Sequence, residues 1–591
     1  MNQKQAGNFS EFLTEMAKSH PLFKSMQPDE VANTTTRITQ AFQGIYDPTQ
    51  FDWTSWANGW AELQQSYTKL WLNTFMEAGK GPTKPSKDAR FRGEEWNEGA
   101  YAFLRQSYEL TSKAMVNMAD KAGLPKKEQQ KLSFYTRVTS DALAPSNFAL
   151  TNPEVLAVIK ETNGTSLMDG FKNLMADLEK GYLATTDEAA FEVGGNLATT
   201  PGSVIYRNEL IELIQYDPMT SKVRKKPILV VPPCVNKFYI FDINEKKSMV
   251  RYLLEQGQTV FMISWRNAGP DTKDYGWDEY LEKGVYQALE VATEISKSDQ
   301  ADLLSWCNGG TLLLAAMAVM TLDQKAKVGS ATFLSSMIDF ADQGGVEVFI
   351  DQQQIDAYKT RLQATGVVPG RDIANAMAML HVNESIWGFV VNNYLKGKSP
   401  APFDVLYWNA DTSNLPETWY SYYVEEMYHA NKLKVPNALT LLGRPVDTRN
   451  IDAPCYFVAA TGDHIVPWTS SHGACDLVSG PSEFVLTAGG HVSGTVINHP
   501  ERNRRFFLSN GPDNVGAEDW QTGAARTEGS WWPHWLTWLD EVSGGSSVAA
   551  PKSVGNKQHN PLAPAPGTYV LEDVPQDGKL PMVKKAKPTD G

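Results

Sequence analysis

Cys307 lies where a short, mostly apolar run ends and a pair of glycines begins. Residues 303–306 precede it, Gly309 and Gly310 follow almost at once, and an apolar helical pattern covers 311–322. A strand, a sharp turn and a helix in this order are typical of a nucleophile elbow, whose turn exposes one reactive side chain to a helix N-terminus. A thiol at that point predicts acyl transfer through a thioester. The alternative interpretation is a buried structural cysteine.

A candidate acid and a candidate base each follow a later predicted strand. Asp463 lies in the loop after the apolar stretch 454–460, and His491 comes soon after the stretch 483–487. An α/β-hydrolase presents nucleophile, acid and histidine in this chain order. His464 is a competing base because it adjoins Asp463. We favour His491, since the two glycines before it suit a base that must reach the elbow.

A tetrahedral oxyanion needs two backbone N–H donors. One belongs to the residue after the nucleophile, here Asn308, and the other to the loop after an early strand, here predicted over 227–231. The two prolines that follow this strand carry no N–H, so the first donors beyond it belong to Cys234 and Val235. We predict that Val235 is the second donor and that Cys234 lines the pocket.

Several longer runs carry a family resemblance. They are the elbow around Cys307 and the stretches 231–242, 259–267, 390–397, 463–468 and 529–535. In these runs the chain resembles the class I, single-subunit polyhydroxyalkanoate synthases, the PhaC family. The family usually has glycine two residues before the cysteine, whereas this chain has Ser305. Serine is small enough to keep the turn, so we expect an altered rate or pocket shape rather than lost activity.

The resemblance implies an acyltransferase that polymerises (R)-3-hydroxyacyl-CoA, above all 3-hydroxybutyryl-CoA, into polyester with release of CoA. His491 would take the proton of Cys307 to form the attacking thiolate. Asp463 would either orient His491 or also activate the attacking hydroxyl, and both roles stay open. No cofactor or metal is expected, because CoA is part of the substrate. The implied partners are the growing polyester, its granule surface in the cytoplasm and a second copy of the chain in a homodimer.

Two other functions compete with the synthase. A thiol esterase or polyhydroxyalkanoate depolymerase of the same fold would result if water reached the thioester. A non-catalytic granule-associated protein would use an aromatic helix as its adhesive. The runs 232–242 and 390–397 favour the synthase over the hydrolase. The intact set Cys307, Asp463 and His491 opposes the non-catalytic protein.

Three regions are predicted along the chain. Residues 1–200 form a mainly helical N-terminal domain, with an aromatic stripe at helical spacing that serves either for packing or as a dimer, granule or partner surface. Strands alternating with helices from 201 onward predict an α/β-hydrolase catalytic domain over 201–591. The alternation stops over about 337–450, which predicts an inserted, aromatic-rich cap that covers the site and excludes water. The tail at about 543–591 is rich in Gly, Ser, Pro and Lys and is predicted to be ordered in patches. The stripe comprises Trp53, Trp56, Trp60, Leu63, Tyr67, Leu70 and Trp71.

The composition excludes several classes of protein. A formal net charge of −14 opposes a nucleic-acid partner, which needs a positive surface. Four cysteines among 591 residues form no disulfide framework and favour a reducing cytoplasm. Residues 1–20 lack the apolar core of a secretory signal, and 311–322 is shorter than the ~20 residues that span a bilayer. Neither a glycine-rich nucleotide loop nor zinc-ligand spacing is found.

Overall fold

The computed structural model describes residues 52–76, 83–362, 365–544, 546–573 and 582–583. The chain divides into two compact units, one from Met1–Glu188 and Met377–Pro402, the other from Ala189–Ala376 and Phe403–Gly591. Part of the region in which a cap is expected, 377–402, therefore belongs with the N-terminal residues. The residues examined for a secretory signal, 1–20, lie outside the described ones.

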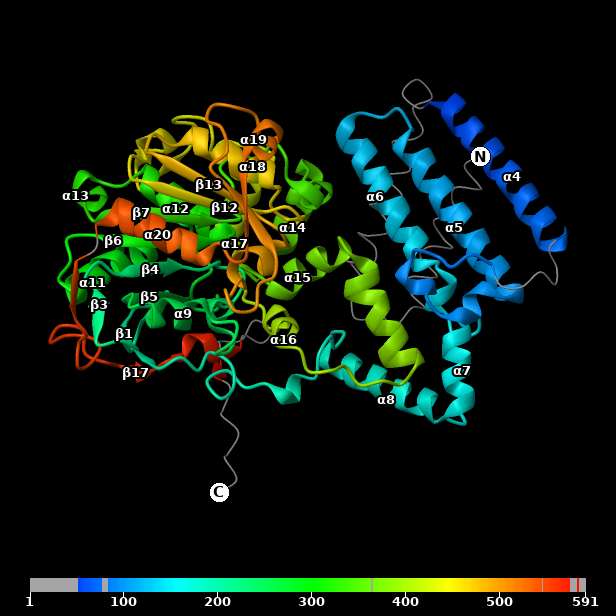
Figure 1. Ribbon diagram of the computed structural model, residues 1–591, viewed down its shortest axis with the longest axis horizontal. Coiled ribbons are helices and arrows are strands. Elements are labelled where there is room, and N and C mark those ends of the chain that lie inside the picture. Colours follow the sequence, from blue (N-terminus) through cyan, green and yellow to red (C-terminus); the bar gives the residue numbers. More distant parts are fainter. Residues whose placement is uncertain (1–51, 77–82, 363–364, 545, 574–581, 584–591) are drawn as a thin grey trace. The chain divides into compact units, whose positions relative to one another are not determined.

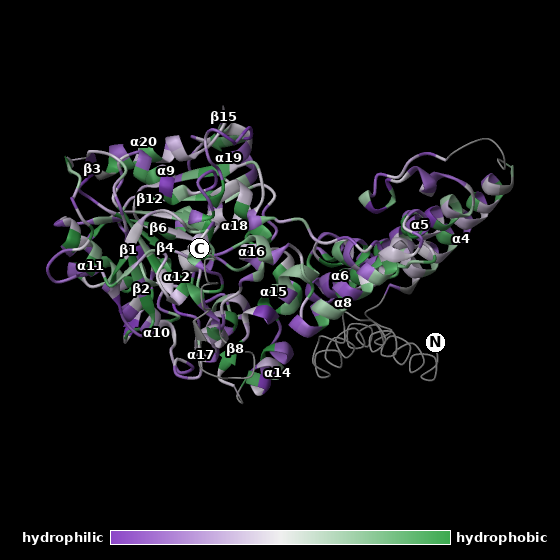
Figure 2. Ribbon diagram, turned by 90° about the horizontal axis from the view of Figure 1, so that it is seen from below, coloured by the Kyte–Doolittle hydropathy of each residue, from purple (hydrophilic) through white to green (hydrophobic). Residues whose placement is uncertain are grey.

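The first unit is helical. Its helices α4, α5 and α6 lie side by side (Figure 1), and hydrophobic and hydrophilic residues mix along them as in amphipathic helices (Figure 2). In α4, Leu63 and Leu70 are buried, whereas Trp60 and Trp71 are about half exposed. The helix thus packs through its leucines. The helices are α4 (Trp53–Met76), α5 (Gly99–Asp120), α6 (Lys126–Ala142), α7 (Pro153–Glu161) and α8 (Thr165–Lys180), followed by the π-helical turns η9 (Asn383–Trp387) and η10 (Val390–Leu395).

An eleven-stranded sheet forms the centre of the second unit, in the order β15-β14-β13-β12-β7-β6-β4-β5-β2-β1-β17. The six strands from β13 to β5 are mutually parallel, and the strands outside them are antiparallel. The strands are β1 (Gly202–Arg207), β2 (Ile211–Tyr216), β4 (Ile228–Val231), β5 (Val260–Trp265), β6 (Ala301–Trp306), β7 (Val328–Leu334), β12 (Cys455–Ala460), β13 (Ser482–Thr487), β14 (Phe506–Ser509), β15 (Ala525–Glu528) and β17 (Ala563–Pro564).

Helices cover both faces of this sheet. Successive strand residues point to opposite sides of it, and apolar residues on each side need a helix to cover them. Leu229 and Leu303 enter an apolar core shared with α11 and α12, whereas Val230 and Leu304 enter a second core shared with α9 and α20. Strands buried on both faces read as continuous apolar runs, as the sequence predicted. The helices are α9 (Met249–Glu255), α10 (Trp277–Glu279), α11 (Gln287–Ser296), α12 (Asn308–Ala318), α13 (Leu322–Lys325), α18 (Trp468–Gly473), α19 (Ala517–Gly523) and α20 (Trp532–Ser543).

The part of 337–450 that belongs to the second unit packs through aromatic rings. Trp419 stacks on Trp277 of α10 at 5.1 Å between ring centroids and contacts Tyr423 at 5.2 Å. Such pairs contribute about 0.5–1.5 kcal/mol each beyond the area they bury. The elements are α14 (Gln352–Leu362), α15 (Gly370–Met379), α16 (Asp404–Ala410), α17 (Glu417–Tyr422) and the π-helical η11 (Tyr423–His429). None of the described helices is both long and apolar enough to cross a membrane.

The tail is tied to the sheet by a buried carboxylate. β17 pairs with β1, and Glu212 of β2 accepts hydrogen bonds from the backbone N–H groups of Thr568 at 2.8 Å and Tyr569 at 3.0 Å. The Thr568 hydroxyl and Arg207 also donate to this carboxylate. Through β17 and Glu212, the described tail residues 562–569 are therefore held against the sheet.

Replacement of Glu212 by glutamine should loosen the tail. The substitution removes the charge and turns one acceptor into a donor opposite Arg207, and hydrogen bonds to charged groups are worth about 1.5–3 kcal/mol. We expect amide hydrogen exchange in a peptide covering 562–573 to speed up by about 10- to 100-fold, at ~1.4 kcal/mol for each tenfold change. The exposed Glu209→Gln change is the control, and equal exchange in both variants would contradict the tail anchor.

Candidate active site

Cys307 occupies the strained turn that the sequence predicted. It follows the last residue of β6 and precedes the first residue of α12, with φ 54° and ψ −132°. A positive φ in a residue with a side chain costs about 1–3 kcal/mol and persists only where the surroundings impose it. Here the Cys307 N–H donates to the Leu334 carbonyl of β7 at 2.9 Å. The thiol is half-buried at the carboxyl end of the parallel strands.

Both glycines after Cys307 are required by close approach. A Cβ on Gly309 would lie 2.5 Å from the Pro232 carbonyl oxygen, and one on Gly310 would lie 1.8 Å from Ser336 Oγ. Ser305 is fully buried on β6, and its hydroxyl donates to the Thr332 carbonyl at 3.1 Å. The Ser305 hydroxyl therefore has a hydrogen-bond partner, and serine at this position leaves the turn in place.

The structure brings His491 against Asp463. Nδ1 of His491 donates to Oδ2 of Asp463 at 2.6 Å, whereas His464 is exposed. The other oxygen of Asp463 accepts the N–H groups of Ile465 at 3.0 Å and Val466 at 2.9 Å. The Cys307 sulfur lies near enough to His491 to raise the pKa of that imidazole. His491 is thus hydrogen-bonded to Asp463 and lies close to Cys307.

The charges of these three groups support one another. Burial opposes a charged imidazole, but the Asp463 carboxylate and the Cys307 sulfur outweigh it and raise the pKa of His491 to about 10. Burial likewise opposes ionisation of Asp463, but His491 and the Val466 N–H hold the pKa of that carboxyl below its usual range. Both shifts favour an imidazolium between two groups that can carry negative charge.

In the Cys307 turn and in the neighbouring loop after β4, two backbone N–H groups donate no hydrogen bond within the described residues. One belongs to Asn308, the first residue of α12, where helix geometry leaves the N–H without an internal partner. The other belongs to Val235 in the loop after β4. The Cys234 N–H, by contrast, donates to Oδ1 of Asn308 at 3.0 Å. Of the two donors weighed from the sequence, Val235 is therefore the one left open.

Aromatic residues enclose the site, and sequence reasoning gave them no role beyond that of cap or core. The Trp306 ring lies 4.9 Å from the His491 ring. Tyr423 and Tyr428, from η11, lie 5.1 Å apart, and burial together with the nearby Cys307 raises the pKa of Tyr428 above its usual range. For Tyr423 and Tyr428, the aromatic enrichment of 337–450 was the signal available, but it did not distinguish these two residues from the other aromatic residues there.

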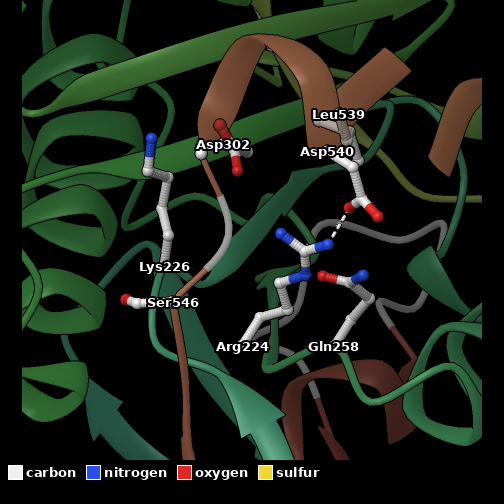
Figure 3. Close-up of a pocket in the computed structure, with 8 residues that line it drawn as sticks. Arg224, Lys226, Gln258, Asp302, Leu539, Asp540 and Ser546 are labelled. Atoms are coloured by element: carbon white, nitrogen blue, oxygen red, sulfur yellow. Dashed lines mark hydrogen bonds and ion pairs between the residues drawn. The ribbon is translucent and has the colours of Figure 1, made fainter. Parts of the chain in front are cut away.

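A polar pocket elsewhere carries no such chemistry. It contains an Arg224–Asp540 ion pair, with Lys226 and Asp302 on its wall (Figure 3). Asp302 is the second residue of β6 and Cys307 follows the end of the strand, so the two are separated by about 16 Å of extended chain. Within the described residues, no three His, Cys, Asp or Glu side chains are arranged to hold a metal ion.

Comparison with known proteins agrees with this geometry. Residues 87–253 match the family described as "Poly-beta-hydroxybutyrate polymerase (PhaC) N-terminus", and residues 227–494 match the alpha/beta hydrolase fold. The chain is 40% identical to the poly(3-hydroxyalkanoate) polymerase subunit PhaC of Cupriavidus necator, over 86% of this chain and 88% of that protein. It is 36% identical to the poly(3-hydroxyalkanoate) polymerase of Methylorubrum extorquens, over 92% and 90% respectively.

A third relative, poly(3-hydroxyalkanoate) polymerase 2 of Ectopseudomonas oleovorans, is 38% identical over 83% of this chain and 88% of its own length. Identity at this level over nearly the whole of each relative includes both the helical first unit and the catalytic sheet. The chain therefore belongs to the poly(3-hydroxyalkanoate) polymerase family, acyltransferases built on the α/β-hydrolase fold.

Proposed function

We propose that this enzyme polymerises (R)-3-hydroxyacyl-CoA, with 3-hydroxybutyryl-CoA as the first substrate to test, through an acyl thioester on Cys307. The observation that carries the proposal is the thiol on a strained elbow, close to His491, which is hydrogen-bonded to Asp463. A thiolate is the nucleophilic form of cysteine, and an adjacent imidazolium stabilises it. The reaction needs no cofactor, because CoA arrives as part of the substrate.

Acylation begins with proton transfer from the Cys307 thiol to Nε2 of His491. The sulfur then attacks the thioester carbonyl, and the Asn308 and Val235 N–H groups receive the oxyanion. The C–S bond to CoA breaks as the carbonyl re-forms, and the proton on His491 passes to the departing CoA sulfur. One thioester is exchanged for another, so the acyl enzyme keeps the energy needed for the next step.

Elongation forms an ester bond at the same centre. The hydroxyl of one hydroxyacyl group attacks the thioester carbonyl of another, and His491 accepts the hydroxyl proton. The C–S bond of the attacked thioester then breaks, and its sulfur leaves as a thiolate that takes up the proton from His491. Both oxygens of Asp463 already accept hydrogen bonds, Oδ2 from His491 and Oδ1 from two backbone N–H groups. These contacts support the orienting role for Asp463 over direct activation of the hydroxyl.

Water must be kept from the acyl enzyme if polymer is to form. Trp306, Tyr423 and Tyr428 surround the thiol with aromatic surface, and the latter two come from the inserted segment. Exclusion of water by such a cover separates a synthase from an esterase on the same fold.

The family further suggests a cytoplasmic homodimer at the surface of polyester granules, and α8 offers a surface for that location. Its polar side is buried in the first unit: Asn173 donates to the Asn393 carbonyl at 3.0 Å, and Asp177 accepts the Tyr394 hydroxyl at 2.8 Å. Its apolar side faces outward, the reverse of an ordinary surface helix. Exposed on that side are Leu167, Met168, Phe171, Met175 and Leu178.

Cysteine-dependent polymer formation is the first test. Purified protein given (R)-3-hydroxybutyryl-CoA should release CoA and deposit insoluble polyester, whereas Cys307→Ala should do neither, because no thioester can form. CoA is titrated as free thiol and polyester is weighed. Release of free hydroxy acid without polyester would establish the hydrolase. Equal CoA release by both proteins would contradict the thioester mechanism.

Asp463→Asn should lower the pKa of His491. The comparison is made between Cys307→Ala and Cys307→Ala/Asp463→Asn, so that sulfur is absent from both and the carboxylate alone differs. NMR of the labelled His491 ring should give a lower midpoint in the double variant. A raised histidine pKa stabilises the fold fully below pH ~6.5, and this contribution is lost as the pH rises through the folded value. The difference in unfolding free energy between the two variants should therefore narrow with rising pH, and unchanged midpoints would contradict the electrostatic role.

The outward face of α8 should bind polyester. Leu167→Ser/Phe171→Ser/Met175→Ser removes three apolar side chains, each worth up to ~1.5–3 kcal/mol if fully buried. We expect co-sedimentation with poly(3-hydroxybutyrate) particles to fall by about tenfold or more, with CoA release from soluble substrate retained. The exposed pair change Asp169→Ser/Lys172→Ser on the same helix is the control. Equal binding by all three proteins would exclude α8 as the contact surface.

A further inference from the structure

The loop after β4, residues 232–237, carries the open Val235 N–H, and its first half is fixed close to the Cys307 turn and the catalytic sheet. Trp265 of β5 donates its indole N–H to the Pro232 carbonyl at 2.9 Å. The Cys234 N–H donates to the Asn308 side chain at 3.0 Å. Both contacts are made by residues that precede Val235. A second set of contacts, beyond Val235, is therefore needed to fix the direction of the Val235 N–H.

That second set comes from residues 408–413, at the end of α16 and just beyond it. The Ser413 N–H donates to the Val235 carbonyl at 3.3 Å, and Asn236 pairs with Thr412 as an antiparallel bridge. The Trp408 indole N–H donates to the Lys237 carbonyl at 2.8 Å. A strand-like segment thus lies along the far half of the loop.

A buried ion pair locks this contact. Nζ of Lys237 lies 2.8 Å from Oδ1 of Asp411, with side chains 5% and 12% exposed, and the Tyr239 hydroxyl donates to Oδ2 of Asp411 at 2.9 Å. Burying both charges costs desolvation that their attraction roughly offsets, so a buried pair is weak evidence for stability. The best-attested use of a buried ion pair is to select one packing arrangement of the chain among several.

We infer that Asp411 and Lys237 are positioning residues for the oxyanion hole. The ion pair holds 408–413 against the loop, and this contact fixes the Val235 N–H at the place where charge develops on the substrate oxygen. An oxyanion donor works only within a few tenths of an ångström of its ideal distance of about 2.7–3.1 Å, so a small shift of the loop weakens it. The inference rests on the proposed role of Val235 in acyl transfer at Cys307.

Two reactions of the Cys307 thiol distinguish a displaced oxyanion-hole donor from general damage to the active site. Acylation by p-nitrophenyl butyrate passes through an oxyanion and releases p-nitrophenol in a burst. Alkylation by iodoacetamide displaces iodide from a saturated carbon and forms no oxyanion. Alkylation therefore reports on Cys307 and His491, and the ratio of the two rates reports on the oxyanion hole. The nitrophenyl ester makes this test independent of the natural acyl-CoA.

Asp411→Asn should lower the burst rate by about 10- to 100-fold, less than the 10²–10³ lost when a donor is removed outright. Turnover of the ester should show a lower kcat with KM nearly unchanged, and alkylation should stay within twofold. The matched control is Asp404→Asn, which breaks a partly buried ion pair between α16 and Lys247, beyond the 232–237 loop. The control should leave both rates unchanged.

A neutral double variant, Lys237→Met/Asp411→Leu, covers the case in which the single variant unfolds. Replacing a buried pair by apolar groups often preserves stability, so its melting temperature should lie near that of the wild type while its burst rate stays low. A parallel loss of acylation and alkylation, an equal loss in Asp404→Asn, or wild-type acylation in the double variant would each overturn the inference. If the wild type is acylated by the ester but inert toward hydroxyacyl-CoA, the proposed function fails and the positioning result stands.

Discussion

The strained turn at Cys307 is the constraint on which the rest of the site depends. A backbone with φ 54° at a cysteine is unfavourable by itself and is imposed by its neighbours. β6 lies between β4 and β7 in parallel register, and the glycines after the cysteine let α12 approach the Pro232 carbonyl and Ser336 without collision. Because the strain is balanced by sheet pairing and close packing, the thiol is presented without a flexible loop.

Burial strengthens the electrostatic attraction between the charged groups of the site, and it also imposes a desolvation penalty on each of them. An isolated carboxylate or imidazolium would be strongly disfavoured in this interior. Asp463 is held by two backbone N–H groups and by His491, which in turn faces Cys307. Each member offsets part of the desolvation penalty of its neighbour.

The inserted segment contributes more than a cover. Tyr423 and Tyr428 place aromatic surface beside the thiol, whereas Trp408 and Asp411 contact the loop after β4 that carries the open Val235 N–H. In the proposed mechanism, exclusion of water and placement of an oxyanion donor would therefore both come from this one stretch of chain.

The sequence by itself determined the features that depend on neighbouring residues. Apolar runs of strand length predicted β4 to β7, β12 and β13, and the order of Cys307, Asp463 and His491 after their strands predicted the candidate site, because parallel strands end at one edge of a sheet. The antiparallel edge strands and the tail pairing with β1 were not predicted. The tail is held by Glu212, which lies some 350 residues away in the sequence.

Only the tertiary structure decided between neighbours with the same local pattern. His464 and His491 were both credible partners for Asp463, and Cys234 and Val235 were both possible donors. The structure decided the first choice because the His491 ring hydrogen-bonds the Asp463 carboxylate. It decided the second because the Asn308 side chain accepts the Cys234 N–H, which leaves the Val235 N–H open. The ion pair of Lys237 with Asp411 was likewise invisible, since nothing local relates two residues on different elements. Such contacts depend on long-range packing, which residue type and spacing do not encode.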